Sequence, residues 1–342
     1  MPALQSETFT FDARPHYPLL IPVTRYWNES LHSQDADALT FVLAHGTSFH
    51  NEHWEPVLEG LYDLLATSMS IGTKIPNIRE AWAIGCPNHG EGAVLNEETL
   101  KEGYSPIFSW DEYGTAIHLV LAGRGKGVDV DFSTRNLVAL GHSMGAIALI
   151  LARTHAPVIR WSKAILIEPM FVHPKFYPRV DAILRLSAPK RRDVWSSREE
   201  ARQAFLSKSF KSWDPRLVDI YAKHGLRDLP TATYPDATGV TLKCTKAQEA
   251  AAYSDVHGRM TAQRYLPTFC TDVPTHAIFG AVPDILPSEN RDFLVKDFAQ
   301  NKFASVSLVE KAGHLAAHNN PDGVAERIYE ALMKKGNTLS KL

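Results

Sequence analysis

Short apolar runs recur along the chain and predict buried strands. The run at 136–140 has the Leu and Val content of a strand that is covered on both faces. Further strands are predicted at 25–30, 39–44, 81–84, 164–169, 275–280 and 305–310. Because stretches of helical character alternate with these runs, the pattern predicts an α/β fold, a mostly parallel sheet with helices on both faces.

A polar pentapeptide, GHSMG at 141–145, separates the run at 136–140 from an Ala- and Leu-rich stretch at 146–152 that is suited to a packed helix. It therefore predicts a sharp strand-to-helix turn. In G-x-S-x-G the glycines let the backbone approach closely, and the serine is strained with its hydroxyl exposed. The helix that begins there favours a developing negative charge. The pattern predicts Ser143 as a nucleophile; the alternative is a glycine-rich turn that happens to contain serine.

The regular spacing of strands stops between residues 169 and 270. This stretch is dense in Pro, Arg, Trp and Tyr, contains a predicted helix at 196–210, and shows no clear strand. We interpret it as an inserted, mainly helical lid between two parts of a core, residues 1–168 and 271–342.

A serine nucleophile on a strand-to-helix turn is expected to use a histidine that comes late in the chain. His314 fits because it follows the last predicted strand in a loop before the final helix, and His318 is its neighbouring alternative. The orienting carboxylate stays open between Glu168 and Asp284, which each follow a predicted core strand. Either could accept a hydrogen bond from the imidazole N–H.

Two backbone N–H groups are expected to form an oxyanion hole. One belongs to Met144, the residue after the predicted nucleophile. The other is expected at Thr47, because the pair His45-Gly46 ends the early strand at 39–44 and leads into a loop.

Composition narrows the classes of partner and cofactor. Lys and Arg number 36 against 38 Asp and Glu, and a net charge of −2 gives no reason to expect nucleic acid or a membrane surface. Three widely spaced cysteines fit neither a disulfide framework nor a zinc pattern, and no metal or bound cofactor is implied. No apolar stretch approaches the roughly 18 residues of a membrane span. The last residues, Ser340, Lys341 and Leu342, match the peroxisomal import tripeptide, so we expect recognition by the import receptor and a peroxisomal location.

Several motifs resemble the α/β-hydrolase superfamily: HGTSFH at 45–50, EHWEP at 52–56, HGEGAVLNEETL at 89–100 and GHSMG. More narrowly, the chain resembles fungal peroxisomal hydrolases of secondary-metabolite pathways, which include toxin-biosynthesis hydrolases and acyl-CoA thioesterases. The likeness covers about residues 20–330, lid included. In that group the triad acid, usually Asp, follows the strand after the turn. Its position falls on Glu168 here, so the resemblance favours Glu168, while the different residue type and the presence of Asp284 keep the choice open.

Together these residues predict a serine hydrolase that cleaves an ester or an acyl-CoA thioester through an acyl-enzyme. A lyase, cyclase or acyltransferase on the same scaffold and an inactive binding module are the alternatives. Candidate lining of the acyl pocket, with core packing of the lid as the alternative, is Trp195, Phe205, Phe210 and Trp213.

A dense basic run in the lid is the other candidate for substrate contact. It comprises Arg191 and Arg192 with Lys190, and Lys208 and Lys211 further along. We expect Arg191 and Arg192 to hold the phosphates of CoA if the substrate is a thioester. The alternative is a solvated face of the lid.

Overall fold

The computed structural model describes residues 3–334, and it leaves the side chains of residues 208 and 209 undescribed. Eight strands form one sheet in the order β1-β2-β4-β3-β5-β6-β10-β11. β2 runs antiparallel to both of its neighbours, and every other pair in this sheet is parallel. The strands are β1 (Gln5–Phe11), β2 (Ile21–Trp27), β3 (Leu39–Ala44), β4 (Ile78–Ile84), β5 (Asn136–His142), β6 (Trp161–Ile167), β10 (Thr275–Gly280) and β11 (Ser305–Val309).

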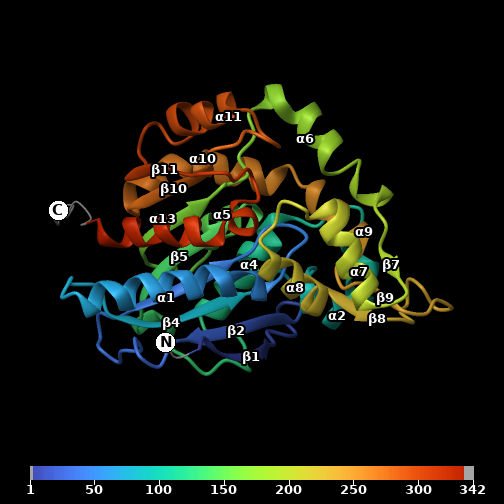
Figure 1. Ribbon diagram of the computed structural model, residues 1–342, viewed down its shortest axis with the longest axis horizontal. Coiled ribbons are helices and arrows are strands. Elements are labelled where there is room, and N and C mark those ends of the chain that lie inside the picture. The colour runs from blue at the N-terminus through green and yellow to red at the C-terminus, as the bar shows by residue number, and fades with distance from the viewer. Residues whose placement is uncertain (1–2, 335–342) are drawn as a thin grey trace.

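Helices cover both faces of this sheet (Figure 1). In β3, Phe41 and Leu43 pack with α1 and α13 on one face, whereas Val42 and Ala44 pack with α4, α5 and α10 on the other. Since successive side chains of a strand point to opposite faces, a strand covered twice reads as a continuous apolar run. The predicted architecture is therefore confirmed, and the unbroken runs have a physical reason.

The helices are α1 (Glu55–Ser70), α2 (Gly90–Leu95), α3 (Glu97–Gly103), α4 (Trp110–Leu121), α5 (Met144–Ala152), α6 (Tyr177–Ile183), α7 (Arg198–Ala204), α8 (Pro215–His224), α9 (Lys246–Tyr253), α10 (His257–Asp272), α11 (Ser288–Phe293), α12 (Ala316–Asn319) and α13 (Pro321–Met333). None of them, within residues 3–334, is long and apolar enough to cross a membrane.

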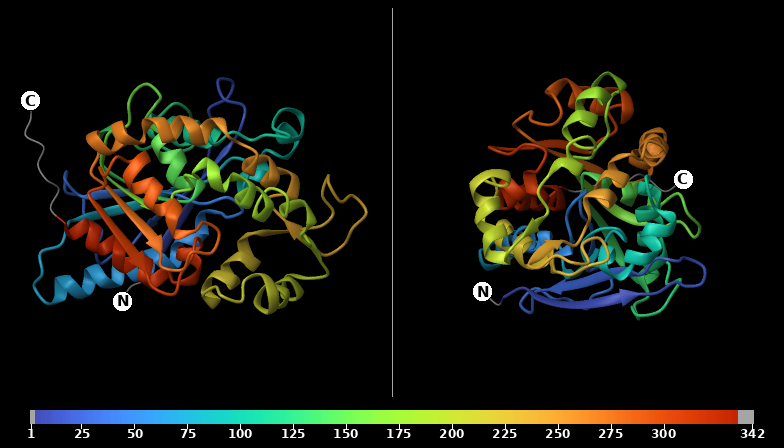
Figure 2. Two further views of the ribbon diagram at one scale, coloured as in Figure 1. Left: turned by 90° about the horizontal axis from the view of Figure 1, so that it is seen from above. Right: turned by 90° about the vertical axis from the view of Figure 1, so that its right-hand side faces the viewer.

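The segment between β6 and β10 carries helices α6 to α10 and a small antiparallel sheet in the order β7-β9-β8. These strands are β7 (Val194–Trp195), β8 (Leu226–Asp228) and β9 (Val240–Leu242). The sequence shows no clear strand here because strands of two or three residues are too short to produce a periodic pattern. Most of the segment, yellow-green to gold, lies beyond one end of the main sheet (Figure 1; Figure 2).

The helix α10 packs against α5 within the core cluster, through Ala262, Leu266 and Phe269. The sequence places most of this helix inside the insertion, which it ends at residue 270. The division of the chain into 1–168, 169–270 and 271–342 stays a prediction.

Candidate active site

The turn after β5 places Ser143 at the start of α5 with a positive φ, at φ 54° and ψ −117°. Such a conformation is strained for a serine and persists only where the surroundings enforce it. The Ser143 N–H donates to the Ile167 carbonyl at 3.0 Å. At Gly145 a Cβ atom would lie 2.1 Å from the Ala44 carbonyl oxygen, so this position requires glycine. The predicted strand-to-helix turn is present, and α5 lies hard against the end of β3.

Two hydrogen bonds join three of the predicted residues. Ser143 Oγ lies 2.9 Å from His314 Nε2, and His314 Nδ1 lies 3.1 Å from Glu168 Oε2. Both Ser143 and His314 are buried, at 7% and 5% exposed. A carboxylate only accepts hydrogen bonds, so Nδ1 carries the proton and Nε2 is left to accept from the serine hydroxyl. This is the tautomer that a general base needs.

Glu168 and Asp284 hold different parts of the His314 loop. The Oε1 atom of Glu168 accepts from the Gly280 N–H at 2.6 Å, which leaves Oε2 for the imidazole. Asp284 Oδ1 instead accepts from the backbone N–H groups of His314, at 2.9 Å, and Ile285, at 2.6 Å. The structure thus brings Glu168 to the imidazole and Asp284 to the backbone.

His318, the alternative base, packs among aromatic rings. Its ring centre lies 4.0 Å from that of Phe49 and 4.5 Å from that of Trp213. Neither ring nitrogen has a hydrogen-bond partner among the described residues, and burial holds the pKa of His318 well below its ordinary value. Its contacts are those of a neutral packing residue.

His142 supports the same loop from the neighbouring position. Its Nε2 donates to the His314 carbonyl at 2.9 Å, and burial lowers the pKa of His142 to about 3. The carbonyl oxygen of His314 only accepts hydrogen bonds, so the neutral ring of His142 carries its proton on Nε2.

The two expected oxyanion donors lie beside each other. Thr47 Oγ1 donates to Met144 Sδ at 3.5 Å, and neither backbone N–H has an acceptor within residues 3–334. His45 anchors the loop that carries Thr47: its N–H donates to the Tyr113 hydroxyl at 3.1 Å, and its Nε2 accepts from the Cys86 N–H at 3.1 Å. His45 thus ties the loop to α4 and to the segment that follows β4.

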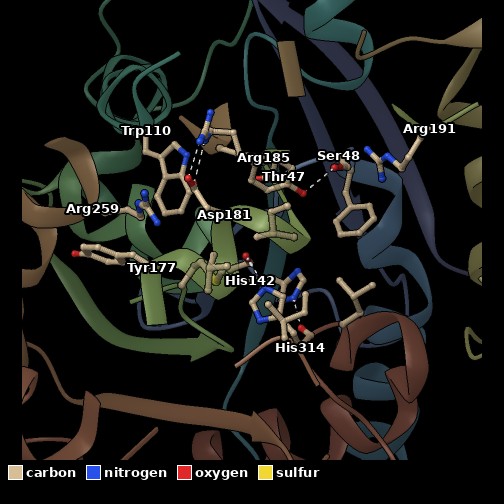
Figure 3. A pocket seen from close by; sticks show the side chains of 18 of the residues that line it. Thr47, Ser48, Trp110, His142, Tyr177, Asp181, Arg185, Arg191, Arg259 and His314 are labelled. Carbon is tan, nitrogen blue, oxygen red and sulfur yellow. Dashed lines mark hydrogen bonds and ion pairs between the residues drawn. The ribbon is translucent and has the colours of Figure 1, made fainter. Parts of the chain in front are cut away.

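Ser143 and His314 line a cavity of about 290 Å³. Figure 3 shows His314 at the wall of this cavity. Three other predicted substrate contacts line it: Arg191, Phe210 and Trp213. The remainder lie elsewhere among the described residues. Trp195 and Phe205 pack in a hydrophobic cluster of the segment between β6 and β10, and Arg192 is bonded to Glu200 at 2.6 Å outside the cavity.

Arg191 joins the segment between β6 and β10 to the loop that carries Thr47. Its guanidinium forms an ion pair with Glu249, whose other oxygen accepts from the Ser48 hydroxyl. Glu249 is only 2% exposed, so this buried carboxylate is compensated by Arg191. The basic run is therefore divided: Arg191 faces the cavity, whereas Lys190 and Lys211 are exposed residues outside its lining.

Sequence reasoning missed one wall of the cavity. Trp110 at the start of α4, Tyr177 and Asp181 on α6, and Arg259 on α10 line it. In the sequence Trp110 resembles a core residue that opens an apolar helix, and Arg259 resembles a solvated residue. No local pattern indicates that their helices meet.

A metal site is not formed by the residues that the structure describes. No group of three or more His, Cys, Asp or Glu side chains within 3–334 is arranged to hold an ion.

One known protein family matches most of the chain. The model of the alpha/beta hydrolase family matches residues 41–327. The chain belongs to the α/β-hydrolase family. The family resemblance expected from its motifs is confirmed.

Fungal relatives of this α/β-hydrolase carry related names. "Type I acyl-CoA thioesterase mpaH" of Penicillium roqueforti is 27% identical over 253 residues, which cover 68% of this chain and 50% of that protein. An "Abhydrolase domain-containing protein ACTT2-1" of Alternaria alternata is 29% identical over 117 residues, which cover 34% of this chain and 44% of that protein. The chain spans about half the length of the curated relatives that it matches.

Solved structures confirm the fold. The peroxisomal alpha-beta-hydrolase Lpx1 of Saccharomyces cerevisiae aligns with a TM-score of 0.70 and 20% identity, covering 100% of this chain and 93% of that chain. A thioesterase domain from the curacin biosynthetic pathway aligns with a TM-score of 0.62 and 16% identity, covering 95% and 99%.

Proposed function

We propose that this α/β-hydrolase is a serine hydrolase that cleaves an ester or an acyl-CoA thioester through an acyl-enzyme. The observation that carries the proposal is the hydrogen-bonded series Ser143, His314 and Glu168, with distances of 2.9 and 3.1 Å, at the wall of a cavity. A nucleophile bonded to a base that a third group orients is the recurrent geometry of covalent acyl transfer.

Each residue then has a defined role. His314 Nε2 takes the proton from Ser143 as Oγ attacks the carbonyl carbon, and Glu168 stabilises the imidazolium that forms. The N–H groups of Thr47 and Met144 donate to the developing oxyanion. Collapse of the tetrahedral intermediate expels the alcohol or thiol, which takes its proton from His314. Water, activated by the same histidine, then releases the acid.

Two observations support a thioester among the substrates. Relatives that match 60% or more of this chain are named acyl-CoA thioesterases. Arg191 presents a guanidinium to the cavity, and guanidinium groups pair well with phosphate. A role in fungal secondary metabolism belongs to the same proposal. The location predicted from Ser340, Lys341 and Leu342 stays a prediction, because these residues lie outside those that the structure describes.

Labelling with a fluorophosphonate tests the nucleophile. The probe should modify the wild-type chain at Ser143, with the adduct assigned by peptide mass mapping, and should not modify Ser143→Ala. Ser48 also lines the cavity and serves as the internal control, since its hydroxyl is held by Glu249. An adduct on Ser48, or unchanged ester turnover by Ser143→Ala, would contradict the proposal. Identification of a free acid as product separates hydrolysis from lyase, cyclase or acyltransferase chemistry.

A further inference from the structure

One side of the cavity carries a cation that the proposed mechanism does not use. Figure 3 shows Arg259 with Trp110 and Tyr177 on this side, apart from His314 and across the cavity from Arg191. The Arg259 Cζ lies 5.3 Å from the centre of the Trp110 ring and 6.0 Å from that of Tyr177. Two aromatic rings therefore hold the guanidinium in place.

The hydrogen-bonding groups of Arg259 are only partly used. Its Nε donates to the Asp255 carbonyl at 2.8 Å, which fixes the side chain to the start of its own helix. Within residues 3–334 its two Nη groups donate no hydrogen bond, and no carboxylate lies within ion-pair distance. The free edge of the guanidinium has donors suited to two oxygen atoms of one group.

The carboxylates near Arg259 already have partners. Asp181 is held by Arg185 through two hydrogen bonds, of 3.1 and 2.6 Å. The Asp255 carboxylate, 2% exposed, accepts from the backbone N–H groups of Trp110 and Gly258. Burial lowers the pKa of Arg259 despite both acids, so the two carboxylates do not fully replace the lost hydration of the cation.

Part of the cavity lining is apolar. Met170, Val180, Leu184 and Ile285 line the same cavity as Ser143. They offer a hydrocarbon surface for the methylene groups of an acyl chain in the cavity that Arg259 also lines.

We infer that Arg259, flanked by Trp110 and Tyr177, binds a carboxylate at the distal end of the acyl group. The substrates preferred by this chain are then esters or thioesters of dicarboxylic acids, in which one carboxyl is esterified and the other is free. This inference rests on the proposed function, because it assigns the acyl group of the same reaction.

Paired esters of equal chain length test the assignment. The p-nitrophenyl monoesters of adipic, suberic and sebacic acid are compared with p-nitrophenyl hexanoate, octanoate and decanoate. We expect wild type to prefer the best carboxylated ester by about tenfold or more in kcat/KM, because a charge-assisted pair replaces water at the guanidinium. Arg259→Gln should abolish this preference through a higher KM for the carboxylated esters, while turnover of the neutral esters stays within about threefold.

Two variants separate recognition from structure. Arg192→Gln removes an arginine that is bonded to Glu200 outside the cavity, and it should keep the wild-type preference. Arg259→Lys keeps the positive charge but lacks the paired N–H donors of the guanidinium, and it should retain part of the preference. Equal preference for both ester types in wild type, or a preference that survives in Arg259→Gln, would overturn the assignment. So would an equal loss on both ester types in Arg259→Gln, which would mark a structural role.

Binding measured without catalysis keeps the inference separate from the proposed function. Calorimetry should show that suberate binds wild type at least about tenfold more tightly than octanoate, which has the same chain length and no distal carboxylate, with the difference lost in Arg259→Gln. Ser143→Ala should bind both as wild type does. If no ester is hydrolysed but this difference is present, the proposed reaction fails and the carboxylate site stands. If esters are hydrolysed without any difference in binding or turnover, the carboxylate site fails and the reaction stands.

Discussion

Replacing Glu168 by glutamine reverses the hydrogen bonding at His314 without changing the size of the side chain. One oxygen of Glu168 accepts from the Gly280 N–H at 2.6 Å, and the other faces His314 Nδ1 at 3.1 Å. Glutamine has one side-chain oxygen, and this oxygen must accept the hydrogen bond from the backbone N–H of Gly280. The amide NH₂ then faces Nδ1, so His314 must carry its proton on Nε2. That tautomer donates toward Ser143 and cannot take its proton.

The cost follows from this reversal. To react, the Glu168→Gln variant must place its amide NH₂ against the protonated Nδ1 of His314, or its side-chain oxygen must turn to Nδ1 and lose the hydrogen bond from the Gly280 N–H. We expect kcat to fall by about 10³- to 10⁴-fold, as when the orienting carboxylate is replaced by its amide elsewhere. This corresponds to about 4 to 5.5 kcal/mol of lost transition-state stabilisation.

The assay is saturating hydrolysis of a p-nitrophenyl ester at pH 7.5, with thermal unfolding as a check on folding. Asp284→Asn is the matched control, because its remaining oxygen can still accept from the backbone of His314 and Ile285. We expect this control to stay within about tenfold of wild type. A Glu168→Gln enzyme within tenfold of wild type, or a larger loss in Asp284→Asn, would refute the reasoning and transfer the orienting role.

Three further perturbations have defined outcomes. Gly145→Ala should prevent soluble expression or lower the melting temperature by more than about 10 °C, since its Cβ would overlap the Ala44 carbonyl; a wild-type melting curve would contradict this. Arg191→Gln should raise KM about tenfold more for an acyl-CoA than for a small neutral ester, and an equal change on both would remove Arg191 as a CoA contact. Burial lowers the pKa of His142 to about 3 and that of His45 to about 4, from an ordinary value near 6.5. The unfolded chain therefore binds more protons than the folded chain below pH 6.5. Each ring should lower the free energy of unfolding by about 2 kcal/mol at pH 5 relative to pH 7.5. Urea unfolding at the two pH values, repeated with His142→Gln, measures this loss, and equal stability at both would contradict the burial argument.

Local patterns were sufficient wherever both faces of an element are buried. The runs at 39–44 and 275–280 coincide with β3 and β10, because every second side chain packs on each face. β1 was missed because most of its side chains are exposed and it pairs only with β2 at the edge of the sheet. β2 was predicted at 25–30, but it occupies Ile21–Trp27.

The sequence by itself determined the strand-to-helix turn around Ser143, the positions of most core strands along the chain and the late position of His314, because each depends on neighbours within a few residues or on chain order. It could not choose between Glu168 and Asp284, since both follow core strands. Only the tertiary structure placed Glu168, 146 residues before His314, against its ring, and turned Asp284 toward the backbone. The same holds for the wall that contains Trp110, Tyr177 and Arg259. These residues come from three helices that meet only when the chain folds. A periodic pattern indicates which face of a helix or strand is buried, but it does not indicate which other element covers that face.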